Sequence, residues 1–109
     1  NQTCQTSPYE TELVEMLLAR GIEGVRQKAI GPYNCDFAAS PVAVEVFGGW
    51  YHWHGHHKLR SEDRFRYLMN WGWNVLAVSV NSREPVTPAL ADYVATYIEQ
   101  TRRNPPLIC

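Results

Sequence analysis

The chain has 109 residues, of which 45% are hydrophobic and 12% aromatic, enough to build one folded domain with a buried core. This composition excludes an intrinsically disordered chain, and no apolar run is long enough to cross a bilayer. The formal net charge of -1 counts against a protein that grips nucleic acid through many phosphate contacts.

The cysteines Cys4, Cys35 and Cys109 are scattered and lack CxxC spacing, which argues against a zinc knuckle. Their odd number also argues against a disulfide framework, so we expect a reducing, cytoplasmic location. Because the chain does not begin with Met, we expect residues 1–109 to be a single domain from a longer protein.

The apolar pattern predicts helices and strands in a definite order. A helix is expected over residues 7–20, because Ser7 is a good N-cap and apolar residues recur with helical spacing. Short strands follow at 25–30, 35–39 and 42–47, separated by turn residues around Pro32 and Pro41. After a loop at 50–58, we expect a helix at 60–71, a strand at 74–80 and a helix at 87–103.

This order predicts an α/β fold built on a mixed four-stranded sheet flanked by helices. Tight turns join the first three strands, so these should form an antiparallel meander. The fourth strand reaches the sheet through a helix, so it should join in parallel.

Glu45 is the first candidate for chemistry, because it interrupts the apolar run VAVEVF of an expected buried strand. A buried carboxylate is costly unless something compensates its charge. Asp36 lies on the preceding strand, across the Ser40-Pro41 turn, and can face Glu45 with side-chain bases roughly 5 Å apart. A divalent cation such as Mg²⁺ or Mn²⁺ would remove their repulsion. Alternatively, Asp36 caps a turn and Glu45 pairs with an arginine.

All four histidines, His52, His54, His56 and His57, lie within a short stretch after that strand. Three histidines with one open position would suit a zinc hydrolase, and a solvated polar loop is the plainer interpretation. We favour one histidine as a general acid or base, because its ordinary pKa lies near neutral pH.

Two further acidic residues have simple structural explanations. Glu10 follows Ser7 by three positions, as in a capping box. Asp63 can pair with Arg60 or Arg66 at helical spacing. On spacing alone, neither residue indicates a site.

Several pieces of sequence nevertheless occur in the order and at the intervals of one nuclease superfamily. They are IGPY-x-x-DF at 30–37, E-x-x-GG at 45–49, and G-x-x-x-H ending at His52. Over about residues 7–81 the chain resembles very-short-patch repair (Vsr) endonucleases and the EDxHD catalytic domains of phage homing endonucleases. Both belong to the PD-(D/E)XK, restriction-endonuclease-like superfamily, so the resemblance implies that α/β core.

The resemblance implies a metal-dependent endonuclease that hydrolyses phosphodiester bonds of double-stranded DNA. The catalytic residues would be Glu10, Asp36, Glu45, His52 and Asp63. Mg²⁺ or Mn²⁺ would be held by Asp36, Glu45 and the backbone carbonyl of Val46. Double-strand cleavage would need two such sites, and therefore a homo-oligomer.

DNA contacts are expected beside the site. Lys58, Arg60 and Arg64 would offset phosphate charge. Either a separate DNA-binding region of a longer protein or clustering of the basic residues would explain the low net charge. Trp50 and Trp53 would stack on bases or wedge into the duplex, with ordinary packing as the alternative.

Phe47 departs from the family pattern, in which Lys, Asp or His is common. This substitution makes His52 carry more of the proton transfer. Alternatively, the domain is an inactive nuclease-like module that binds DNA or protein.

Overall fold

The structure is a computed structural model that describes residues 8–47 and 56–104, and within the latter range the side chains only from residue 62 onward. Its elements are α1 (Pro8–Ala19), β1 (Val25–Ile30), β2 (Tyr33–Ala39), β3 (Val42–Phe47), α2 (His56–Asn70), β4 (Asn74–Ser79) and α3 (Pro88–Arg103).

The four strands form one sheet in the order β1-β2-β3-β4. The first three pair antiparallel and β4 pairs with β3 in parallel, which confirms the topology expected from the connections. The β2–β3 turn at Ser40-Pro41 is tight, with Ala39 opposite Val42. Residues 36 and 45 are therefore brought to equivalent positions of neighbouring strands.

Two boundaries differ from the sequence prediction. β2 begins at Tyr33, because Gly31 adopts φ +60 and turns the chain within two residues. A side chain at Gly31 would also collide with the Tyr67 hydroxyl. α2 begins at His56 instead of residue 60, and the histidine-rich sequence lacks the apolar period that would reveal a helix start.

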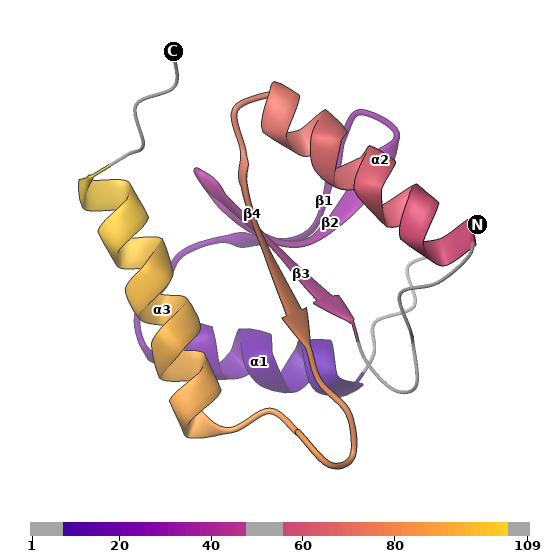
Figure 1. Cartoon of the computed structure of the whole chain (residues 1–109). Helices are drawn as coiled ribbons and strands as arrows, with labels where there is room; N and C mark the ends of the chain where they lie inside the picture. The colour runs from indigo at the N-terminus through magenta and orange to yellow at the C-terminus, as the bar shows by residue number, and fades with distance from the viewer. Residues whose placement is uncertain (1–7, 48–55, 105–109) are drawn as a thin grey trace.

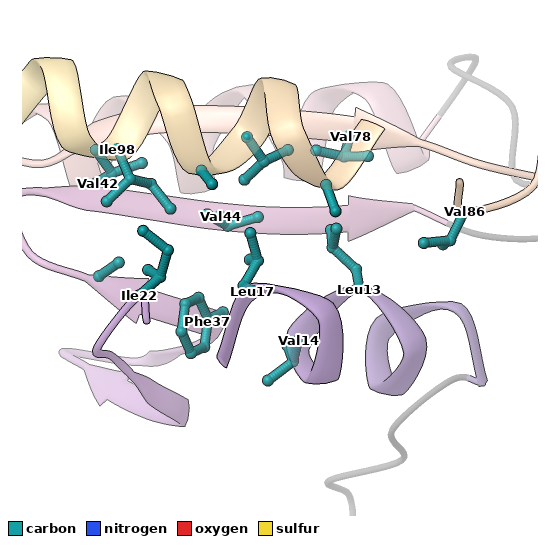
Figure 2. Packing of buried hydrophobic residues seen from close by; sticks show 14 of the residues in the cluster. Leu13, Val14, Leu17, Ile22, Phe37, Val42, Val44, Val78, Val86 and Ile98 are labelled. Atoms are coloured by element: carbon teal, nitrogen blue, oxygen red, sulfur yellow. The ribbon is translucent and has the colours of Figure 1, made fainter. Parts of the chain in front are cut away.

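The sheet lies between two helical layers (Figure 1), with α1 and α3 on one face and α2 on the other. Leu13 and Leu17 of α1, Val44 of β3 and Ile98 of α3 form the centre of the larger apolar cluster (Figure 2). On the opposite face, Leu68 of α2 packs in a smaller cluster with Ala38 of β2 and Ala43 of β3. Each face thus buries the apolar stripe of its helices.

Some residues on the expected apolar stripes are exposed. Leu18 of α1, Met69 of α2 and Tyr93 of α3 are each about half exposed or more, at 49%, 55% and 61%. Each neighbours a buried residue in sequence but lies at the edge of its stripe, where the helix surface turns away from the sheet. In the described part of the chain, no helix has both the length and the apolar composition of a membrane span.

Candidate active site

The candidate site lies where β2 and β3 separate. Their ladder ends at Phe37 opposite Val44, and the next two residues, Asp36 and Glu45, carry the acidic side chains. Oδ2 of Asp36 accepts a hydrogen bond of 2.8 Å from the Val46 backbone N–H. The Asp36 side chain thus takes the place of a backbone acceptor at the point where the strands part.

Glu10 reaches the same place from the first turn of α1, where its side chain is buried with 3% exposure. Oε2 of Glu10 accepts a 2.8 Å hydrogen bond from Nε2 of Gln27 on β1. The same Nε2 lies 3.4 Å from Oδ1 of Asp36. Gln27 therefore links the helix carboxylate to the strand carboxylate.

Arg64 of α2 provides a positive charge on the other side of the cluster. Its Nη2 donates to Oε1 of Glu45 at 2.8 Å and also to the backbone carbonyl of Asn34. The guanidinium lies 5.7 Å from the ring centroid of Tyr33, within cation–π range. The arginine is held in place by β2 as well as by its charge partner.

Glu45 is the most deeply buried charge of the cluster, at 2% exposure. Burial raises the pKa of Glu45 to about 7, with Arg64 lowering it and Asp36 adding repulsion. Burial also raises the pKa of Asp36, against the lowering effects of the Val46 N–H and Arg64. The pKa of Glu10 is raised by burial and by Asp36, while the Gln27 hydrogen bond opposes this. Burial is thus the main reason why the pKa of each of these three carboxyl groups is raised.

Two buried atoms of the cluster are unsatisfied, one acceptor and one donor, and only the acceptor could bind a cation. Oε2 of Glu45 and Nε of Arg64 are buried and have no hydrogen-bond partner among the described residues. A buried carboxylate oxygen without a partner is unfavourable, so it marks a position that a ligand would stabilise.

Divalent-cation binding fits this donor set in kind. Asp36 and Glu45 offer hard oxygen atoms, which Mg²⁺ and Mn²⁺ prefer. The Val46 carbonyl points toward β2, because the N–H and C=O of one strand residue face the same side and this N–H meets Asp36. Over the described residues, however, no three acidic, histidine or cysteine side chains already stand in metal-binding geometry.

The other predicted site residues either lie outside the described part of the structure or are away from the acidic cluster. His52, Trp50 and Trp53 lie outside the described residues, and Lys58 and Arg60 fall in α2 where only the backbone is described. Asp63 is on the outer surface of α2, with its side chain 71% exposed and 3.9 Å from Arg66. This ion pair is the structural alternative that its helical spacing suggested.

Phe47 belongs to the packing between β3 and α2. Its ring meets that of Phe65 edge-on, with centroids 6.0 Å apart. An apolar residue at the end of β3 thus anchors the helix that carries Arg64.

Comparisons with known proteins give one informative result. No protein-family model matches the sequence, and no curated protein matches it. Among solved structures, the catalytic domain of homing endonuclease I-Bth0305I is similar, with a TM-score of 0.58 and 15% identity. The likeness covers 90% of this chain and 93% of that chain. The chain has a nuclease-like fold.

This likeness and the observed topology confirm the predicted fold class, an α/β core with a mixed four-stranded sheet flanked by helices, as in that homing endonuclease domain. At such low identity the likeness concerns the fold alone. The chemistry therefore has to be argued from the residues gathered at the separation of β2 and β3.

Two members of the cluster were not assigned to it from the sequence. Gln27 was not singled out, since nothing in a strand sequence marks one polar residue as a link to a helix. Arg64 was assigned to phosphate, whereas its guanidinium contacts Glu45. The sequence did hold the general signal for this pairing, because a buried Glu45 needs either a cation or an arginine.

Proposed function

We propose that the chain is a divalent-metal-dependent DNA endonuclease that hydrolyses phosphodiester bonds. The observation that carries this proposal is the pair of neighbouring carboxylates Asp36 and Glu45, half-buried and buried where two strands of a nuclease-like fold separate, with Glu10 linked to Asp36 through Gln27. A purely structural role gives little reason to bury Glu45 beside Asp36, whose charge raises the pKa of Glu45.

In this proposal Asp36, Glu45 and the Val46 carbonyl hold Mg²⁺ or Mn²⁺. A divalent ion at that position would polarise a phosphate oxygen and favour attack by water. The protein's own part is to keep the ligand oxygens in place. The Val46 N–H orients Asp36, and Arg64 orients Glu45.

Proton transfer is assigned to His52, which follows the end of β3 in the sequence. Its imidazole would take a proton from the attacking water or give one to the leaving oxygen. Glu10 supports the site through Gln27 and Asp36. The proposal does not use Asp63, because its side chain is exposed and pairs with Arg66.

The substrate in this proposal is double-stranded DNA, with Lys58 and Arg60 offsetting phosphate charge and Trp50 and Trp53 contacting bases. Arg64 would act on DNA only if it left Glu45. The order of the sequence pieces supports a Vsr-like or EDxHD-type enzyme in particular. Cutting both strands would require two copies of the site.

Cleavage of supercoiled plasmid with Mg²⁺ or Mn²⁺ tests the proposal. Asp36→Asn keeps an acceptor for the Val46 N–H but removes the charge, so cutting should fall about 10³-fold or more. Its melting temperature should stay level or rise, because a repulsive charge is gone. His52→Ala should slow cutting by about 10²-fold, the usual scale for a lost proton-transfer group.

The matched control is Asp92→Asn, the same change at an exposed carboxylate on α3 that pairs with Arg20 far from the cluster in sequence. It should cut like the parent. If Asp36→Asn and His52→Ala also cut like the parent, the catalytic site is elsewhere.

A second candidate is an inactive nuclease-like module that binds DNA or protein. The observation in its favour is Phe47, whose ring packs on Phe65 at a position where the resembling nucleases carry a polar group. Millimolar Mn²⁺ discriminates the two. Mn²⁺ should raise the melting temperature of a chain with a working cation site, because the ion binds the folded state and not the unfolded state. It should leave the melting temperature of a chain without such a site unchanged.

A further inference from the structure

Gln27 has an unusual backbone for a strand residue. Its φ is 50°, the one positive value at a non-glycine residue within 8–47 and 56–104. It stands opposite Asp36, yet this pair is missing from the β1–β2 ladder. Arg26 and Lys28 on either side keep their partners in unbroken register. The distortion is therefore confined to one residue, and strand pairing does not require it.

The distortion changes where the side chain goes. In a regular strand, consecutive side chains point to opposite faces of the sheet. Here Arg26 donates to Oγ1 of Thr11 at 3.2 Å, and Gln27 donates to Glu10 at 2.8 Å. Both targets are on α1. The left-handed conformation at Gln27 lets two neighbouring residues of β1 reach the same helix.

The amide group of Gln27 suits its position between two acidic groups. A side-chain amide has two N–H bonds on one nitrogen. Here that nitrogen lies 2.8 Å from Glu10 and 3.4 Å from Asp36. A left-handed backbone is unfavourable for a residue with a Cβ atom, so surrounding contacts have to hold it. The described contacts around Gln27 are those with the two carboxylates and the paired strand residues on either side of it.

We propose that Gln27 is a positioning residue of the cation site, which fixes Asp36 relative to Glu10 so that Asp36 can bind the ion. This inference rests on the proposed function. Gln27 acts through the carboxylates and does not contact the phosphate. A supporting residue of this kind affects metal affinity through the orientation of the ligand it touches.

Calorimetric titration of the whole chain with Mn²⁺, without DNA, tests the inference apart from activity. Gln27→Met keeps the side-chain length and the strained backbone but loses the amide. Gln27→Gly loses the amide and also relieves the strain, since glycine accepts positive φ. Both variants should bind Mn²⁺ about tenfold more weakly than the parent. The glycine variant should be at least as stable as the methionine variant.

Gln100→Met on the exposed surface of α3 is the matched control and should bind Mn²⁺ like the parent. If Gln27 has only a structural role, the two variants will change the melting temperature and leave Mn²⁺ affinity unchanged, which overturns the inference. Unchanged affinity in variants of a parent that cuts DNA would leave the proposed function intact. A parent that binds Mn²⁺ without cutting, with weakened variants, would overturn the function and support the inference. A parent that does not bind millimolar Mn²⁺ overturns both.

Discussion

Two regions of this small fold are buried to the same degree and have opposite chemistry. In the apolar cluster between α1, β3 and α3, Leu17 is 0% exposed and belongs to a group of buried apolar side chains. In the acidic cluster at the separation of β2 and β3, Glu45 is 2% exposed and one of its oxygens has no described partner. Burial alone thus does not distinguish a core from a site. The distinction lies in whether the hydrogen-bonding and charge requirements of the buried groups are met by their neighbours.

We expect the largest loss of stability when a side chain of the apolar cluster is truncated. Leu17→Ala should lower the free energy of unfolding by about 2–5 kcal/mol, because the cavity lies between two helices and a sheet that cannot close on it. Chemical denaturation measures this. Leu18→Ala, on the same helix but 49% exposed, is the control and should have a much smaller effect. Equal losses for both would contradict the assignment of this cluster as the core.

The acidic cluster should instead make stability depend on pH. Glu45 has a pKa of about 7 in the folded protein against an ordinary value of 4.5, so the folded state holds this proton more tightly. Stability is then highest below pH 4.5 for this group and falls as pH rises through 7, by up to about 3 kcal/mol. Melting curves between pH 5 and pH 8 measure it.

Glu45→Gln is the control for this pH dependence, because the amide does not ionise. The fall in stability between about pH 5 and pH 7 should flatten in this variant. Mn²⁺ should reduce the fall in the parent, since the cation binds the ionised carboxylate. A parent whose stability rises over this range would show that Arg64 compensates Glu45 fully.

Removing Arg64, the charge partner of Glu45, tests how far the ion pair stabilises the acidic cluster. Arg64→Met leaves Glu45 buried without its cation, and should lower stability by about 1–3 kcal/mol at pH values where Glu45 is ionised. The double variant Arg64→Met/Glu45→Gln should recover most of the loss. Thermal melts check both, with Arg66→Met, 69% exposed on the same helix, as a control of small effect. Mn²⁺ should stabilise Arg64→Met more than the parent, because the ion supplies the missing positive charge.

The smallest effect is expected at Asp63. Its side chain is exposed, so Asp63→Asn should change the free energy of unfolding by less than about 0.5 kcal/mol. The plasmid assay examines the catalytic role that the family resemblance implied for this residue. A loss of cutting as large as that of Asp36→Asn would mean that the site extends beyond the separation of β2 and β3.

The order and type of the elements followed from local sequence alone. Hydrophobic periodicity, the Thr87 cap and the tight turn at Ser40-Pro41 act over a few residues, and α3 begins with that cap. The same short-range logic placed Asp36 beside Glu45, because a two-residue turn fixes which residues of two strands face each other.

Only the tertiary structure decided the rest of the site. Glu10 became buried because α1 packs against the sheet, and Arg64 reached Glu45 because α2 covers the other face. Gln27 joined them through a backbone conformation that its own residue type does not favour. Contacts between segments far apart in the chain depend on how whole helices dock on the sheet. No local propensity carries that information.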